Sequence, residues 1–170
     1  MISLLALFLQ AIAAPAPVAP WTVTNRTSTD GTIHTTLASV PSSDGNARLV
    51  MKCDAGTEKV VSVQFFTRTA LGGPPDRPVT LTIDGGTPLG ANWEFVEKGA
   101  FIREDIGVTT LAAAIASAKT INVHTTTAAG EPIDASFAGP TSPAPVTAVL
   151  AACDYTLGTV PVRAKPAPKK

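Results

Sequence analysis

The stretch INVHTTTAAGEPIDASF, residues 121–137, decides most about the fold, because apolar and polar residues alternate on both sides of a turn signal. The two apolar faces can meet only in an even register, since a slip of one residue would reverse every side chain. A three-residue loop over 128–130, with Gly130 in the left-handed conformation, satisfies this condition. The sequence therefore predicts a hairpin that pairs Ile121 with Phe137 and Thr127 with Glu131.

The same register gathers polar side chains on the opposite face of the hairpin. It sets His124 across from Asp134, and Ser136 lies two residues further along the second strand. One hypothesis is a small hydrolase in which Ser136 is the nucleophile, His124 the base and Asp134 the orienting acid. However, the chain has no G-x-S-x-G nucleophile elbow, and a cross-strand pair more commonly adds only ~0.2–1 kcal/mol of stability. We therefore interpret these residues as a polar-face site and predict no catalytic residue.

Alternation with a period of two continues outside the hairpin and predicts further half-buried strands. The clearest are ARLVMKCD (47–54), KVVSVQFF (59–66) and PVTLTID (78–84), and weaker ones cover 33–37, 92–96 and 100–102. We expect an α+β fold that is mainly antiparallel β, with a sandwich-like sheet and two short helices.

Two segments change to a helical period and predict these helices. TTLAAAIASAK, residues 109–119, is rich in alanine, with Thr109 or Thr110 as the expected N-cap. SPAPVTAVLAACDY, residues 142–155, begins with prolines, which a first helical turn tolerates. It then places Val146, Leu150 and Cys153 on one buried stripe.

The two cysteines of the chain, Cys53 and Cys153, are predicted to form one disulfide. Cys53 lies on the apolar face of a predicted strand, so the bond would fasten the last helix to the sheet. A cross-link that closes a loop of about 100 residues contributes ~4.7 kcal/mol in the chain-entropy model. No CxxC motif or His spacing indicates a metal site, and no cofactor is predicted.

The first twenty residues, MISLLALFLQAIAAPAPVAP, have the pattern of a secretory signal, a short apolar run followed by small residues. The run is too short to span a membrane, and no transmembrane segment is expected in the mature chain. Together with the disulfide, this predicts a periplasmic or secreted protein. A single domain over 21–157 and a Pro- and Lys-rich disordered tail over 158–170 complete the predicted organisation.

Three remaining features bear on function. Thirteen basic residues balance thirteen acidic ones, and no basic patch is interleaved with aromatics, so nucleic-acid binding is not predicted. Trp93 could stack on a ligand, which makes a carbohydrate- or peptide-binding module an alternative function. Asp84 precedes Gly85 and Gly86, a favoured turn combination. It belongs to the possible polar-face site only if another polar side chain lies beside it on that face.

The order of the motifs LVMKCD, VVSVQFF, PVTLTIDGG, ASFAG and AACDY resembles the small exported bacterial proteins grouped with VasI, which are associated with type VI secretion. More loosely it is similar to the invasion-associated locus B group. The resemblance implies a non-catalytic envelope or secretion-accessory protein that acts on an unknown protein or envelope component. It supplies no site residue, because Thr82 stands where the VasI pattern often has an Arg before the Asp.

Overall fold

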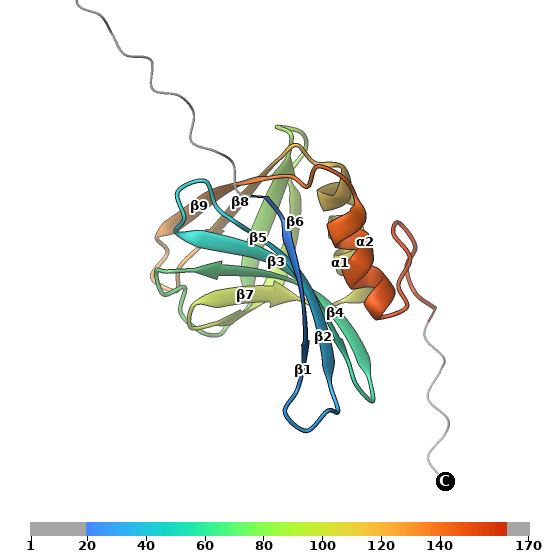
Figure 1. Cartoon of the computed structure of the whole chain (residues 1–170). Coiled ribbons are helices and arrows are strands. Elements are labelled where there is room, and N and C mark those ends of the chain that lie inside the picture. The colour runs from blue at the N-terminus through green and yellow to red at the C-terminus, as the bar shows by residue number, and fades with distance from the viewer. Residues whose placement is uncertain (1–19, 163–170) are drawn as a thin grey trace, which may run out of the picture.

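The computed structural model describes residues 20–162 of the 170-residue chain. The predicted signal, apart from Pro20, and the predicted tail from Arg163 onward lie outside these residues. Nine strands form one antiparallel sheet in the order β1-β2-β3-β4-β7-β6-β5-β8-β9 (Figure 1). The strands are β1 (Thr22–Thr27), β2 (His34–Pro41), β3 (Ala47–Ala55), β4 (Lys59–Thr67), β5 (Arg77–Ile83), β6 (Leu89–Val96), β7 (Gly99–Ile102), β8 (Thr120–Thr126) and β9 (Pro132–Ala138), and the helices are α1 (Asp105–Ser117) and α2 (Ala144–Ala152).

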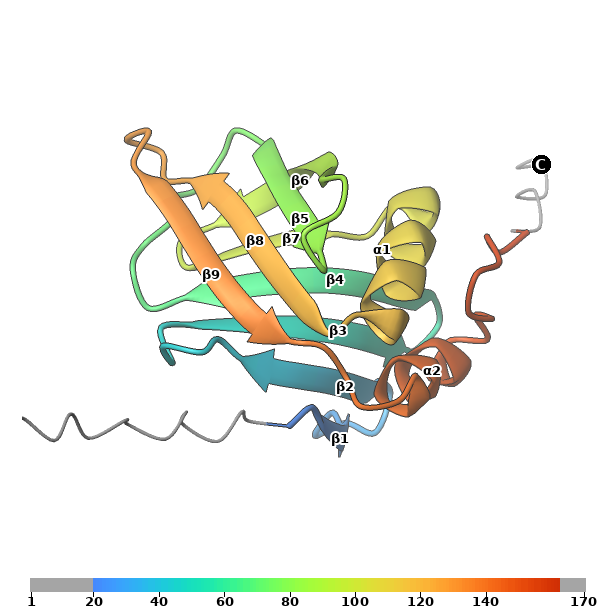
Figure 2. The same cartoon turned by 90° about the horizontal axis from the view of Figure 1, so that it is seen from above.

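The sheet curls so that its last strands face its first ones, and the core lies between them. Figure 2 shows β8 and β9 running at an angle to β2, β3 and β4, with both helices at one end of the curled sheet. Across the core, the rings of Phe65 on β4 and Phe137 on β9 meet edge to face, with centroids 6.2 Å apart. The predicted sandwich-like antiparallel fold with two short helices is confirmed.

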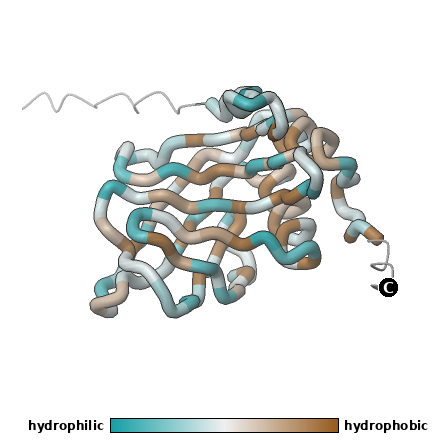
Figure 3. The backbone as a smooth tube through the Cα atoms, turned by 90° about the horizontal axis from the view of Figure 1, so that it is seen from below, coloured by the Kyte–Doolittle hydropathy of each residue, from teal (hydrophilic) through white to brown (hydrophobic). Residues whose placement is uncertain are grey.

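Alternation along the strands separates this core from the outer face. On β3 the side chains of Leu49, Met51 and Cys53 are 0% exposed, whereas Arg48 on the same strand is exposed. Brown and teal segments alternate along the strands in Figure 3 for the same reason. Residues with odd numbers on β3 therefore face the core, and those with even numbers face the outer side of the sheet.

The hairpin β8–β9 has the predicted register. Ile121 lies opposite Phe137, and the Thr127 amide donates to the Glu131 carbonyl at 2.9 Å. Gly130 has a φ of 85°, the left-handed conformation that the loop requires. The hydrophobic pattern and the turn residues favour the same pairing here, so the register could be predicted from the sequence.

Helix α1 begins earlier than the sequence predicted, so the assignment of Thr109 or Thr110 as N-cap is wrong. The carboxylate of Glu104 accepts hydrogen bonds from the amides of Ile106 at 3.0 Å and Gly107 at 2.7 Å, and caps the helix instead. Thr109 lies inside the helix, where its hydroxyl donates to the Asp105 carbonyl at 2.7 Å. A long acidic side chain thus does the capping that the sequence analysis expected from threonine.

The disulfide between Cys53 and Cys153 is confirmed. It joins the inner face of β3 to the C-cap residue of α2, and both cysteines are at most 2% exposed. Helix α2 packs on β2 and β3, whereas α1 packs on β4 and α2. None of the helices in residues 20–162 is long and apolar enough to cross a membrane.

The two edges of the sheet differ. The first edge strand, β1, escaped the sequence analysis, and its outer edge carries no backbone hydrogen bond within residues 20–162. At the other edge, the carbonyl of Ser136 on β9 accepts from the Ser43 amide at 2.8 Å. The neighbouring Ala138 carbonyl accepts from the Trp21 indole Nε1 at 2.9 Å. The curl of the sheet therefore covers one end of β9 with residues from beside β1 and β2.

Candidate functional site

The polar side chains of the β8–β9 hairpin pair with one another. His124 Nδ1 and Asp134 Oδ1 are 2.8 Å apart, and both side chains are exposed. The hydroxyl of Ser136 donates to Asn122 Oδ1 at 2.6 Å. No hydrogen bond joins Ser136 to His124 within the described residues, so the serine lacks the contact to a base that the hydrolase alternative needs.

Asp84 stands at the end of β5 and fastens that strand to the start of β8. Its φ of 50° and the φ of 71° at Gly85 turn the chain as predicted. Asp84 Oδ1 accepts from the amides of Thr120 at 2.7 Å and Lys119 at 2.9 Å. The Thr120 amide is the main cause of a lowered pKa of the Asp84 carboxyl. The carboxylate is therefore occupied by backbone donors and serves the fold.

Trp93 is 1% exposed and belongs to the core side of β6, so its indole offers no open face for stacking on a sugar or peptide. Within residues 20–162, no group of three or more His, Cys, Asp or Glu side chains could hold a metal ion. The residues singled out from sequence thus lie in four places: the paired hairpin face, the turn after β5, the buried disulfide and the core.

A different surface, on the outer face of β1 to β4, gathers four basic residues from separate parts of the chain. Strand registers place Thr22, Ser39, Val50 and Gln64 in one row across these strands. The next row brings Arg48 of β3 opposite Phe66 of β4. We call the four basic residues of this surface, Arg26, Arg48, Lys52 and Arg68, the cationic face.

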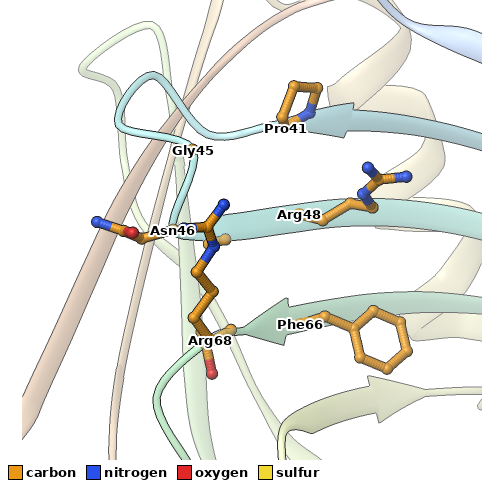
Figure 4. A pocket seen from close by; sticks show the side chains of 8 residues that line it. Pro41, Gly45, Asn46, Arg48, Phe66 and Arg68 are labelled. Atoms are coloured by element: carbon orange, nitrogen blue, oxygen red, sulfur yellow. The ribbon is translucent and has the colours of Figure 1, made fainter.

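Two shallow grooves run over the cationic face and share Arg48 and Phe66. The first has a volume of about 280 Å³ and also includes Arg68, as Figure 4 shows from close by. The second has a volume of about 430 Å³ and extends over Lys52 to Arg26 at the sheet edge. No acidic side chain lines either groove.

The arginines of the cationic face differ from the other charged groups in their pairing. Lys52 forms an ion pair with Asp54 at 2.7 Å. The side chains of Arg26, Arg48 and Arg68 make no hydrogen bond or ion pair to any residue between 20 and 162. By contrast, Arg103 elsewhere on the sheet binds both carboxylate oxygens of Glu94 at 2.9 Å. Such a guanidinium fork matches a carboxylate or phosphate group, so Arg48 and Arg68 can bind an anion from outside the chain.

Sequence reasoning missed this surface because its members are far apart in the chain. Arg26, Arg48 and Arg68 come from three different segments, and only the strand registers bring them together. One indication of it was present in the sequence: Arg48 and Lys52 alternate with Cys53 along their strand, so they face away from the buried side. Comparison of the chain with protein-family models, curated proteins and solved structures finds no match.

Proposed function

We propose that this chain is a non-catalytic, exported accessory protein of the cell envelope, and that its cationic face binds an acidic surface of a partner protein. The observation that carries the proposal is the pair Arg48 and Arg68, which have no ion pair within residues 20–162 and line one groove with Phe66. A protein that used this surface only for solubility would not need guanidinium groups beside a half-exposed aromatic ring.

The composition and shape of the surface favour a protein partner. Arginine and aromatic residues are enriched in protein interfaces, where they supply hydrogen bonds and contact area. Phe66 is 39% exposed and lines the same groove as the two arginines. The grooves are shallow and spread over four strands, which suits a broad partner better than an enclosed small molecule. A positive surface also speeds encounter with an acidic partner.

Export is supported by two independent features. Residues 1–20 have the composition of a secretory signal, and a buried disulfide suits an oxidising compartment. The motif order similar to the VasI group favours an envelope or secretion-accessory role. Expression in a bacterial host tests this: we expect the processed chain in the periplasmic fraction, without a thiol that reacts with Ellman's reagent in denaturant. Full-length chain in the cytoplasm with two reactive thiols would contradict export.

Binding is tested with a fluorescein-labelled polyglutamate peptide, followed by fluorescence anisotropy. We expect the double substitution Arg48→Ala and Arg68→Ala to raise the dissociation constant roughly tenfold, because two exposed charge pairs of up to ~1 kcal/mol each are lost. The matched control is Arg103→Ala, which removes an arginine already paired with Glu94 and should leave binding unchanged. A loss of binding free energy in Arg103→Ala that is half of the loss in the double variant would mean that only net charge matters.

The ionic-strength dependence and a second anion complete the test. Binding should weaken as salt rises from about 0.05 to 0.15 M, because exposed charges are screened over about 8 Å at the upper concentration. Vesicles with anionic lipid serve as the competing anion. Stronger binding to vesicles than to polyglutamate, lost in the same double variant, would overturn the protein partner in favour of a membrane surface.

A further inference from the structure

The outer edge of β1 offers unused backbone groups for pairing. β1 is an edge strand of the sheet (Figure 1), and its six residues pair with β2 in one unbroken register. The Ser28 amide donates to the Ile33 carbonyl at 2.9 Å in continuation of this register. In an antiparallel ladder the backbone groups of alternate residues point to opposite sides, so the even-numbered residues of β1 bond to β2. The amides and carbonyls of Val23, Asn25 and Thr27 therefore point away from the sheet, and they have no hydrogen bond within residues 20–162.

This edge lacks most of the features that protect edge strands from pairing with another chain. Natural sheets protect an edge with proline, charged side chains, a bulge or a covering segment. β1 has the sequence TVTNRT, which contains no proline, and its register has no bulge. The opposite edge strand, β9, begins with Pro132, and its Ser136 carbonyl accepts from the Ser43 amide. Of the two edges, β1 is therefore the one that can accept an added strand along its whole length.

The one charged residue of β1, Arg26, determines which strand this edge can accept. Thr24 and Arg26 line the larger groove of the cationic face, so the even-numbered side chains of β1 point to the outer side. In its row across the sheet, Arg26 lies opposite Thr35, and Thr35 lies opposite Asp54. The Asp54 carboxylate already accepts from the Thr35 hydroxyl at 2.6 Å and pairs with Lys52 at 2.7 Å. Arg26 is thus left without an ion pair in residues 20–162, directly beside the open edge.

An antiparallel strand added to β1 brings one of its side chains next to Arg26. Its residues opposite Val23, Asn25 and Thr27 exchange backbone hydrogen bonds with β1, and those opposite Thr24 and Arg26 form the pairs without hydrogen bonds. In such a pair the Cα atoms are only about 4.5 Å apart, and both side chains lie on the same face. An acidic residue opposite Arg26 therefore meets the guanidinium group, and opposite charges across two strands stabilise their pairing.

A second copy of the chain complements this edge less well than an acidic strand. Two copies of β1 can form the same backbone hydrogen bonds, for example in a register centred on Asn25. That register sets Arg26 opposite Thr24 of the other copy, and TVTNRT contains no acidic residue that could pair with the arginine. Charge complementarity therefore favours an acidic segment of a different protein.

We propose that an extended acidic segment of the partner protein adds to the sheet as an antiparallel strand beside β1, with an acidic residue opposite Arg26. Acidic residues at every second position of this segment lie on the outer side, continuous with the cationic face. The inference rests on the proposed function, because it names the conformation in which the acidic partner binds beside that face. Backbone hydrogen bonds supply affinity, and the alternating charges supply selectivity.

Two capped peptides of equal charge and composition test the proposal. In one, threonine and glutamate alternate, and in the other the same residues occur in pairs. Only the alternating peptide can place all its carboxylates on the outer side of the sheet, so it should bind roughly fivefold more tightly. Amide hydrogen exchange of the ¹⁵N-labelled chain locates the contact. The alternating peptide should slow exchange at Val23, Asn25 and Thr27, whereas Thr24 and Arg26, which already bond to β2, serve as the internal reference.

Variants separate backbone pairing from attraction by charge. Asn25→Pro removes one outward amide, a change that an edge strand tolerates, and should weaken binding of the alternating peptide roughly fivefold, as expected for one hydrogen bond. Asn25→Ala is the matched control, because it also removes the bond from the Thr36 hydroxyl to Asn25 Oδ1 but keeps the amide. Arg26→Ala should weaken the alternating peptide by a similar factor, whereas Arg103→Ala should leave it unchanged.

Equal affinity of Asn25→Pro and Asn25→Ala for the alternating peptide would overturn the added strand, as would unchanged exchange at Val23 and Thr27 in excess peptide. A dimer of the chain alone in sedimentation velocity, lost in Asn25→Pro, would overturn the partner segment in favour of a second copy. The cationic face fails by a different result, namely unchanged polyglutamate binding in the double variant of Arg48 and Arg68. The two proposals are therefore tested separately.

Discussion

The β8–β9 hairpin and the β1–β4 part of the sheet both have polar outer faces, but their polar groups have different partners. On the hairpin, His124 pairs with Asp134 and Ser136 with Asn122. On the β1–β4 face, Arg48 and Arg68 find no partner within the described residues. The difference teaches that a visible acid–imidazole pair indicates less about function here than an arginine without an ion pair in residues 20–162.

The largest loss of stability is expected from removal of the disulfide, because it closes a loop of about 100 residues. Cys53 lies on β3, the strand that also carries Arg48. Replacing Cys53 and Cys153 together by alanine should lower the free energy of unfolding by up to about 4.7 kcal/mol, the value for a loop of about 100 residues. Urea denaturation measures this loss. Polyglutamate binding well below the unfolding midpoint should persist, since no cysteine lies on the cationic face. An unchanged unfolding midpoint would show that the disulfide does not hold the framework.

A smaller loss of stability is expected from Asp84→Ala, on the side of the hairpin. The substitution leaves the amides of Lys119 and Thr120 without their carboxylate acceptor and places alanine at a φ of 50°. The melting temperature should fall by more than it does in a His124→Ala variant, and polyglutamate binding should not change. Asp84→Asn is the control for conformation, because asparagine tolerates this φ and keeps one oxygen acceptor.

A carboxylate placed beside Arg48 would give this arginine a partner, as His124 has in Asp134 on the hairpin. Phe66→Glu places a carboxylate directly opposite Arg48, where a cross-strand pair is within reach. We expect a roughly tenfold weaker affinity for polyglutamate, with nearly unchanged stability. Ile106→Glu introduces the same charge at a position of 61% exposure on α1 and is the control. Equal weakening by both substitutions would remove the argument for a specific face.

Acid pH should weaken the loop that borders the cationic face. Asp44 has a pKa lowered to about 2 by hydrogen bonds, first from the Ser42 hydroxyl and then from the Asn46 amide. A folded-state pKa below the usual 3.8 means that its stabilising effect is present above pH 4 and is lost as pH falls from about 3.8 to 2. Thermal unfolding from pH 5 to 2 should show a shallower decline in Asp44→Ala. Identical slopes would contradict this role.

The smallest effect is expected from His124→Ala. Its pair with Asp134 is exposed, so the loss in the free energy of unfolding should be about 1 kcal/mol or less. Urea denaturation measures this loss, which is compared with the losses in the Cys53 and Asp84 variants. A loss several times larger would show that the hairpin face contributes more than a surface pair, and would reverse the comparison with the cationic face.

Sequence patterns predicted the parts of the fold in which neighbouring signals agree. The hairpin follows from strict alternation around Gly130, and the disulfide follows from two cysteines that both lie on buried faces. The start of α1 was missed because Glu104 caps through a longer side chain than the preferred cap residues. Strand β1 was missed because TVTNRT is mostly exposed and buries no apolar stripe.

The candidate sites depend on contacts between distant segments, which alternation alone does not give. Arg48 and Arg68 become neighbours only through the pairing of β3 with β4. Site prediction therefore stopped at the hairpin, where both partners lie within one short segment.

The contacts of Ser43 and Trp21 with the carbonyls of β9 also bear on self-association. A sheet with two open edges can add strands from further copies without limit, and such growth ends in fibres. Here one edge is covered, so an incoming strand at β9 would first have to displace the indole of Trp21 and the loop that holds Ser43. Edge-to-edge contact through β1 can join two copies, whereas growth through β9 would first have to free its covered end. The contacts at β9 thus leave β1 as the one edge strand, within residues 20–162, whose outer side is open along its whole length for pairing with another chain.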